Sequence, residues 1–254
     1  MPEELTDEVR YERRGAAALV TIDRPARRNA IDGKTADALV AALESFEADD
    51  DARVMVLTGA GEAFCAGADL TAIETLEPRA RRGEGPLGFT RRTATKPTIA
   101  AIGGWAVAGG LELAVWCDIR VASPRAQFGC LERRFGVPLI DGGTWRLPRI
   151  VGFGRAMDLV LTGRLVASAE ALAIGLVTAV VDDPVAHALA MTEQLAAYPQ
   201  ETMLSDRKSM YDGYGHLLEE ALAIEARYGS EVLLVGRAGA QRFASGEGRG
   251  ASGV

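Results

Sequence analysis

The hydrophobic positions in the first half of the chain form short apolar runs separated by glycine-rich turns and by one stretch with helical spacing. Runs at residues 9–13, 17–23, 54–58 and 98–102 are bounded by turn-forming or charged residues, and this pattern predicts strands. Between residues 33 and 48 the apolar positions recur every three or four residues, which predicts a helix with one buried face. This alternation of strands and helices indicates an α/β fold.

The second half of the chain changes to mainly helical spacing after about residue 146. The apolar positions predict helices over residues 156–161, 168–174, 184–198, 201–211 and 217–235. Short strands are predicted at residues 119–122, 127–129 and 177–181. We expect Ser168 to cap its helix. No linker of disordered composition divides the chain, so we expect an α/β core over residues 1–195 and a helical region over 196–254 that is not an independent domain.

Two stretches require separate interpretation. Residues 77–88 mix Pro, Gly and Arg, which predicts an exposed, mobile loop. Residues 98–117 are twenty residues long and carry one charge, Glu112, so their length would span a bilayer. Two glycine pairs interrupt this run, and Glu112 would lie in the hydrocarbon at a cost of a few kcal/mol. We therefore expect a buried strand, a glycine turn and a short buried helix from about residue 109.

The composition excludes several classes of protein. The chain has 254 residues, with 28 basic and 35 acidic side chains and a formal net charge of −7, which argues against binding to nucleic acid or to an anionic membrane. Three cysteines are too few for a disulfide framework. Two histidines without i, i+4 spacing argue against a histidine-based metal site. The acidic, polar first ten residues do not resemble a targeting peptide. We therefore expect a cytoplasmic protein.

Common nucleotide and hydrolase motifs are absent, which leaves backbone groups and carboxylates as the candidate chemistry. The sequence has no P-loop, no complete dinucleotide-binding glycine motif and no G-x-S-x-G. Two glycine loops, at residues 65–70 and 108–112, each follow a predicted buried strand and begin a helix. Exposed N–H groups at two such helix starts would form an oxyanion hole. The alternative is that small residues merely let a helix pack close to a strand.

Several ordered segments resemble a known family. They are TIDRP (21–25) with RNA (28–30), GAGEAFCAGADL (59–70), KPTIAAI (96–102), AGGLEL (108–113), CD (117–118), and GGT (142–144) with RLPR (146–149). Through them the chain resembles the enoyl-CoA hydratase/isomerase (crotonase) superfamily from about residue 9 to residue 248. The resemblance implies a ClpP/crotonase-type ββα spiral core with a C-terminal helical oligomerisation region, assembled as a trimer or as a dimer of trimers.

The resemblance also implies a ligand and a site. The ligand would be an acyl-CoA thioester, whose oxygen would be held by the backbone N–H groups of Ala68 and Gly109. Glu112 and Glu132 match the two catalytic glutamates of the hydratases. Two carboxylates around one water suit addition to a double bond, because one proton leaves the water and another goes to the α-carbon. For Glu132 the alternative is an ion pair with the adjacent Arg133 or Arg134.

Further substrate contacts are expected around these loops. They are Ala66, Asp69, Leu70, Ile140 and Asp141. The segment Pro138-Leu139-Ile140-Asp141 replaces a Pro-Gly-Ala type of segment common in hydratases, so Leu139 and Ile140 would narrow the acyl pocket. We expect Asp141 to cap the helix that follows it, with catalysis as the alternative. The lysine-rich ending of many hydratases is missing, so Arg24, Arg27 or Arg28 would contact the CoA phosphates.

These observations predict an enoyl-CoA hydratase, a lyase that converts a trans-2-enoyl-CoA to a 3-hydroxyacyl-CoA. The alternatives are an isomerase that uses Glu132 alone, another crotonase-type reaction that uses Asp141, and a non-catalytic acyl-CoA-binding trimer. We expect no metal and no cofactor, since coenzyme A is part of the substrate. The expected partners are this thioester and further copies of the chain, with no nucleic acid and no membrane.

Overall fold

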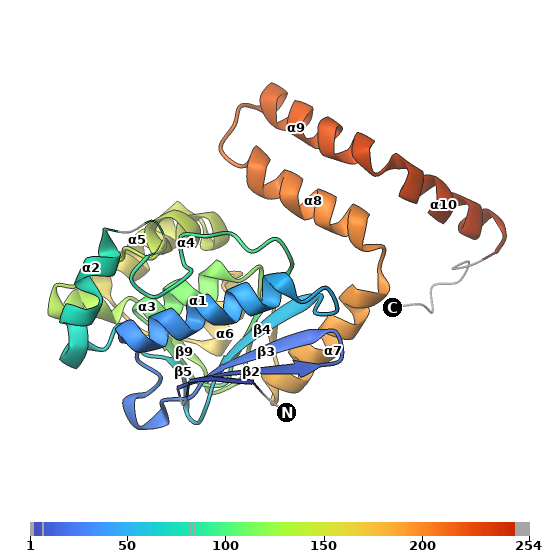
Figure 1. The fold of residues 1–254 in the computed structure, drawn as a ribbon. Coiled ribbons are helices and arrows are strands. Elements are labelled where there is room, and N and C mark those ends of the chain that lie inside the picture. Colours follow the sequence, from blue (N-terminus) through green and yellow to red (C-terminus); the bar gives the residue numbers. More distant parts are fainter. Residues whose placement is uncertain (1–2, 7, 82, 84, 247–254) are drawn as a thin grey trace. The chain divides into compact units, whose positions relative to one another are not determined.

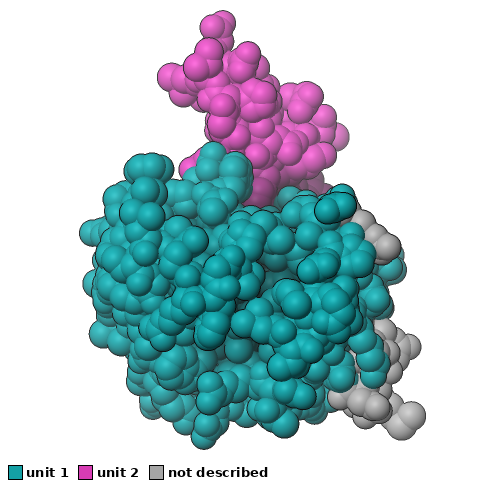
Figure 2. All heavy atoms as spheres, turned by 90° about the vertical axis from the view of Figure 1, so that its left-hand side faces the viewer, with its two compact units in different colours: residues 1–192 teal, residues 193–254 magenta. Residues whose placement is uncertain are grey.

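A computed structural model describes residues 3–6, 8–81, 83 and 85–246 of the chain. The chain divides into two compact units, residues 1–192 and 193–254, which are coloured separately in Figure 2. The first unit contains the sheets and the glycine loops, and the second contains helices. That the second unit does not fold by itself stays a prediction.

The larger sheet of the first unit has seven strands in the described part of the chain. In spatial order they are β1 (Glu3–Thr6), β2 (Val9–Arg14), β3 (Ala17–Ile22), β4 (Val54–Gly59), β6 (Thr98–Ile102), β8 (Ile119–Ala122) and β11 (Ala179–Val180). β1, β2 and β3 pair antiparallel, and the pairs from β3 to β11 are parallel. The central strand β4 is buried at five of its six positions, as its continuous apolar sequence predicts.

Strands of a second sheet follow strands of the first sheet in sequence, so the chain winds as a spiral. The order of the second sheet is β10 (Val166–Ala167), β9 (Gln127–Gly129), β7 (Trp105–Val107) and β5 (Ala63–Cys65). The chain runs three times from the first sheet to the second and then into a helix. The three passages are β4–β5–η2 (Leu70–Thr75), β6–β7–α3 (Gly109–Trp116) and β8–β9–η3 (Leu131–Phe135), of which β4, β5, α3 and β9 are labelled in Figure 1. This winding confirms the predicted ββα spiral.

The first unit also contains helices outside this winding. They are η1 (Pro25–Arg27), α1 (Gly33–Ala48), α2 (Glu77–Ala80), α4 (Gly143–Val151), α5 (Phe153–Thr162) and α6 (Ser168–Ala173), while α7 (Pro184–Ala197) continues into the second unit. α1 begins where predicted, because the Asp32 side chain accepts the N–H of Thr35. Its buried face includes Leu39, Leu43 and Phe46 at helical spacing.

The apolar stretch at residues 98–117 folds as two short strands and one helix. β6 and β7 are followed by α3, whose eight residues are all buried. The strand β7 was not predicted, because three residues carry too little pattern to separate from a turn. Within the described ranges, no helix has the length and apolar character needed to cross a membrane.

Two local predictions in the first unit are wrong. Residues 77–88 are not a fully exposed loop, because α2 forms there and residues 85–88 are buried. The Arg79 side chain is also buried, pairs with Asp37 and donates to the Pro86 carbonyl. Ser168 is not a cap, because Ala167 precedes the helix and the Ser168 hydroxyl donates to the Pro124 carbonyl.

After the end of α7, the described residues of the second unit form three further helices. They are α8 (Gln200–Gly213), α9 (Leu218–Glu231) and α10 (Leu233–Ala244), and α8 packs against α9. The single helix predicted over residues 217–235 is wrong, because Val232 leaves the helical conformation at φ −110° and ψ 11°. Gly229 and the β-branched Val232 both lower the helix propensity at this position.

Candidate active site

The two glycine loops contact each other through their backbones. A Cβ atom on Gly67 would lie 2.7 Å from the Gly109 nitrogen, so only glycine allows this approach. Gly67 also has a φ of +90°, which favours glycine. Ala108 has a positive φ of +53° with a ψ of −129°, an uncommon conformation for a residue with a side chain, directly before α3 begins at Gly109. The small residues of both loops therefore allow the start of η2 and the start of α3 to approach each other closely.

The N–H groups of Ala68 and Gly109 belong to these loops. Ala68 lies in a parallel bridge with Ile31, which uses the Gly67 carbonyl and the Asp69 N–H and leaves the Ala68 N–H out. Gly109 is the first residue of α3, where N–H groups have no partner within the helix. In the described part of the chain neither N–H donates a hydrogen bond, and both residues line one cavity.

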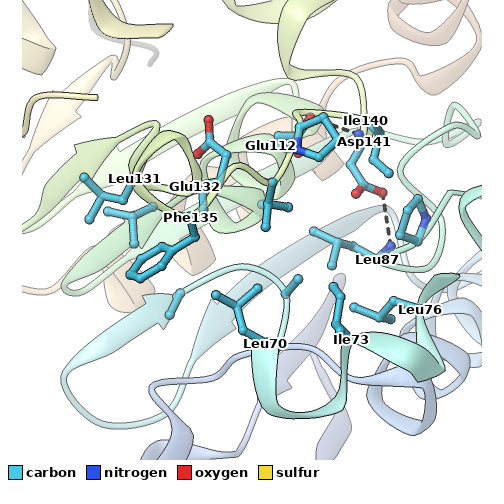
Figure 3. A pocket seen from close by; sticks show the side chains of 18 of the residues that line it. Leu70, Ile73, Leu76, Leu87, Glu112, Leu131, Glu132, Phe135, Ile140 and Asp141 are labelled. Atoms are coloured by element: carbon cyan, nitrogen blue, oxygen red, sulfur yellow. Dashed lines mark hydrogen bonds between the residues drawn. The ribbon is translucent and has the colours of Figure 1, made fainter. Parts of the chain in front are cut away.

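This cavity has a volume of about 480 Å³ and a mainly apolar lining. Figure 3 shows Leu70, Ile73 and Leu76 along one side, with the carboxylates of Glu112, Glu132 and Asp141 opposite. Among the other predicted residues, Ala66 and Ile140 also line it. The structure thus brings together eight of the predicted site residues. They are Ala66, Ala68, Leu70, Gly109, Glu112, Glu132, Ile140 and Asp141.

Glu112 lies in the first turn of α3 and is 3% exposed. Its Oε1 atom accepts the backbone N–H groups of Asp141 at 2.9 Å and Gly143 at 2.8 Å. Burial raises the pKa of Glu112 to about 8, the charge of Asp141 adds to this rise, and the two N–H donors oppose it. A Cβ atom on Gly143 would lie 2.8 Å from Glu112 Cγ, so this glycine leaves room for the carboxylate.

Glu132 lies in η3, is 6% exposed, and accepts no hydrogen bond at either carboxylate oxygen. The alternative of an ion pair with a neighbouring arginine is wrong, since Arg133 Nε donates to the Val160 carbonyl instead. Burial raises the pKa of Glu132. A buried carboxylate with both oxygens unpartnered is costly unless a ligand or a water completes it, which makes Glu132 a candidate functional group.

Asp141 does not cap α4, so this prediction is wrong. The residue before the helix is Gly142 at φ +98°, and the Asp141 carboxylate turns to a different segment. Its Oδ1 atom accepts the Leu87 N–H at 3.1 Å and the Thr90 hydroxyl. Burial raises the pKa of Asp141, and the Thr90 hydrogen bond opposes this rise.

Three predicted contact residues do not line the cavity. The Arg24 side chain is 12% exposed and is held by Asp32 at 2.9 Å, Asp69 at 3.3 Å and Glu8 at 3.6 Å. The Asp69 carboxylate is occupied by Arg24 and by the N–H and hydroxyl groups of Thr71. Arg27 is exposed at the end of η1 and is not a lining residue. Arg28, the third arginine considered, does line the cavity.

Several contributors were missed by sequence reasoning. Leu87 and Phe135 line the cavity, and Thr90 anchors Asp141. They lie in short irregular segments, where spacing carries no periodic information. The paired glycines at 142–143 belong to the segments that resemble the family. They were the one sequence feature that indicated a close contact between this backbone and a side chain, which is that of Glu112.

The described residues near the cavity offer neither a metal site nor a reactive thiol. In the described ranges, no group of three or more His, Cys, Asp and Glu side chains could hold a metal ion. Cys65, beside the first glycine loop, is fully buried, and burial raises the pKa of its thiol to about 12. A thiol held protonated in this way is a poor nucleophile.

Comparisons with known proteins agree with this geometry. Residues 12–245 match the family described as Enoyl-CoA hydratase/isomerase. A short-chain-enoyl-CoA hydratase of Clostridium acetobutylicum is 42% identical over 176 residues, covering 67% of each chain. Enoyl-CoA hydratase EchA19 of Mycobacterium tuberculosis is 37% identical over 232 residues, covering 88% of this chain and 87% of that protein.

A solved structure shares the fold along almost the whole chain. The crystal structure of enoyl-CoA hydratase EchA1 from Mycobacterium marinum aligns with a TM-score of 0.88 at 34% identity, covering 94% of this chain and 96% of that one. The similarity of sequence and of structure thus extends well beyond the loops and carboxylates of the cavity. This chain belongs to the enoyl-CoA hydratase/isomerase family.

Proposed function

We propose that this protein is an enoyl-CoA hydratase that adds water to a trans-2-enoyl-CoA and forms a 3-hydroxyacyl-CoA. The observation that carries the proposal is the pair of buried carboxylates, Glu112 and Glu132, in an apolar cavity that also contains Ala68 and Gly109. The names of the similar proteins support the same reaction.

In the proposed reaction the backbone stabilises the charge that develops on the thioester. The N–H groups of Ala68 and Gly109 donate to the thioester oxygen, which becomes an enolate oxygen as water adds to C3. Both groups lack other acceptors in the described part of the chain, so no existing bond has to break first. Each such donor contributes about 3–4 kcal/mol to transition-state stabilisation.

The two glutamates exchange the protons. The ionised carboxylate takes a proton from the water as its oxygen bonds to C3, and the protonated carboxylate gives its proton to C2. Afterwards the pair still holds one proton, with the two roles exchanged, so the step balances. Burial raises the pKa of both groups, which lets one of them hold a proton near neutral pH. The titration belongs to the coupled pair rather than to either residue.

The assay that separates the alternatives is hydration of crotonyl-CoA, followed by the loss of its enoyl absorbance. A hydratase removes this absorbance, whereas a non-catalytic binding protein does not. An isomerase requires one carboxylate and would shift a 3-enoyl-CoA double bond without hydrating crotonyl-CoA. The presence of both Glu112 and Glu132 in the cavity favours hydration.

The proposed reaction needs no metal and no redox cofactor, because only water and a proton are transferred. Coenzyme A enters as part of the substrate, and Arg28 is the cation in the cavity lining that would attract its phosphates. Activity should therefore survive dialysis against EDTA and depend on Arg28. We also propose that the protein acts in the cytoplasm and assembles as a trimer or hexamer.

A further inference from the structure

The proposed reaction uses two of the three buried carboxylates that line the cavity and leaves the third, Asp141, without a role. We propose that Asp141 is a positioning residue. Its carboxylate fixes residues 87–90 by accepting hydrogen bonds from Leu87 and Thr90, and its backbone N–H fixes the Glu112 carboxylate by donating to it. This inference rests on the proposed hydratase activity for its kinetic part only. Its structural part concerns how the cavity wall is held together.

Asp141 joins two segments that are distant in sequence. Its Oδ1 atom accepts the Leu87 N–H and the Thr90 hydroxyl, and its carbonyl accepts Arg146 Nη1 at 3.0 Å. Arg146 Nη2 donates to the Thr90 carbonyl at 2.7 Å, so Asp141 and Thr90 are linked a second time. Arg91 Nη2 adds a bond to the Ile140 carbonyl at 3.0 Å. The Asp141 carboxylate is the centre of this network.

The fastened segment lies along α3, which carries both the Gly109 N–H and Glu112. At the start of α3, a Cβ atom on Gly109 would overlap Leu87 Cδ1, so the Leu87 side chain rests against this glycine. At the other end, the rings of Phe89 and Trp116 lie 4.3 Å apart, and Trp116 Nε1 donates to the Arg92 carbonyl at 2.7 Å. Movement of this segment would therefore displace the glycine loop at residues 108–112, which carries the Gly109 N–H.

The second contact of Asp141 reaches the proposed acid–base pair directly. Its N–H donates to Glu112 Oε1, so the position of its backbone sets the position of that carboxylate. Figure 3 shows the hydrogen bond from Leu87 to Asp141 at the edge of the cavity, next to Ile140. Asp141 thus contacts Glu112 directly and, through Leu87, is linked to the glycine loop at residues 108–112.

Substitution by Asn and by Ala separates positioning from proton transfer. Asn keeps an oxygen that accepts from Leu87 and Thr90, but it cannot carry a proton. A positioning role predicts that Asp141→Asn keeps kcat within about 3-fold, while Asp141→Ala loses about 10–100-fold because the site is misplaced. If Asp141 instead transfers a proton, both variants lose activity alike, and that result overturns the proposal.

A measurement without substrate tests the structural part. Hydrogen–deuterium exchange of a peptide covering residues 85–92 should quicken by about 10-fold in Asp141→Ala and remain near wild type in Asp141→Asn. Thr90→Val should quicken it less. Glu132→Gln is the matched control, because Glu132 lines the same cavity but makes no hydrogen bond, so exchange at 85–92 should not change. Unchanged exchange in Asp141→Ala overturns the proposal even if the wild type hydrates crotonyl-CoA.

The pH profile gives a third readout. Around Asp141 lie Glu112 on α3, Glu132 in η3, and the cations Arg91 and Arg146. The Asp141 charge raises the pKa of Glu112, so its removal in Asp141→Asn should move the limb of the kcat profile that reports the glutamate pair to lower pH. A wild type that hydrates no crotonyl-CoA would refute the proposed function while leaving the exchange result to decide the positioning role.

Discussion

Glu112 and Glu132 differ in how the protein holds them, although both are buried carboxylates of one cavity. Glu112 accepts two backbone N–H groups, whereas Glu132 accepts none. The first is therefore fixed before any ligand binds, and the second has its full hydrogen-bonding capacity available. This contrast suits a pair that must hold one water between them.

Replacing either glutamate by glutamine should remove hydration and spare binding. We expect Glu112→Gln and Glu132→Gln each to lower kcat for crotonyl-CoA by at least about 100-fold, since each removes a general acid or base. Because the amide keeps the shape of the side chain, the Kd for a saturated acyl-CoA, measured by calorimetry, should change little. A Glu132→Gln variant with near wild-type kcat would contradict the two-carboxylate mechanism.

Glu112 should also make stability depend on pH. Burial raises its pKa from 4.5 to about 8. A carboxyl group of this kind stabilises the fold fully below its unfolded pKa, and the contribution is lost as pH rises through the folded pKa. The free energy of unfolding, from urea titrations at pH 5 and pH 8, should therefore fall less in Glu112→Gln than in the wild type. Equal losses in both proteins would show that Glu112 is ionised at no cost.

The start of α3 is the element that should be least tolerant of change. Gly109→Pro removes one N–H donor and fixes φ near −65°. If this N–H stabilises the enolate, turnover should fall about 10²–10³-fold. Thermal unfolding and acyl-CoA binding are measured alongside, because proline can also disturb the helix start. A well-folded variant with ordinary turnover would make the second glycine loop a packing feature only.

The start of α4 should matter for a different reason. The Gly143 N–H donates to Glu112 Oε1. In Gly143→Ala the new Cβ atom would lie 2.8 Å from Glu112 Cγ and would therefore displace the Glu112 side chain. We expect kcat to fall by about 10-fold or more, because a displacement of roughly 1 Å can cost 10²-fold in rate. Gly154→Ala, on α5 with open space at its Cβ, is the matched control and should retain activity.

The second unit exposes several large apolar side chains. Among the exposed side chains, Leu217 is 77%, Leu218 is 75% and Leu234 is 79% accessible. Burial against further copies of the chain would remove this surface from water, and a closed ring does so without leaving an unpaired interface. We therefore expect a trimer or hexamer by sedimentation velocity at micromolar concentration. A stable monomer there would contradict the assembly.

Much of the fold follows from the sequence because strong local patterns agree with it. The apolar run of β4, the helical spacing of α1 and the glycine pairs around β6 and α3 each have one satisfactory structure. These patterns predicted the α/β core and the two helix starts. The family resemblance added the ββα spiral and the pairing of Glu112 with Glu132.

Only the tertiary structure decided where irregular segments go and which partners charged groups take. Leu87 is buried against Gly109 from a segment that reads as a loop, and Asp141 turns to Thr90 rather than to the helix beside it. Arg24 is surrounded by three carboxylates that are distant from one another in the sequence. The physical reason is that a side chain's hydrogen-bond partner is set by long-range packing, whereas spacing along the chain records only which face of an element is buried.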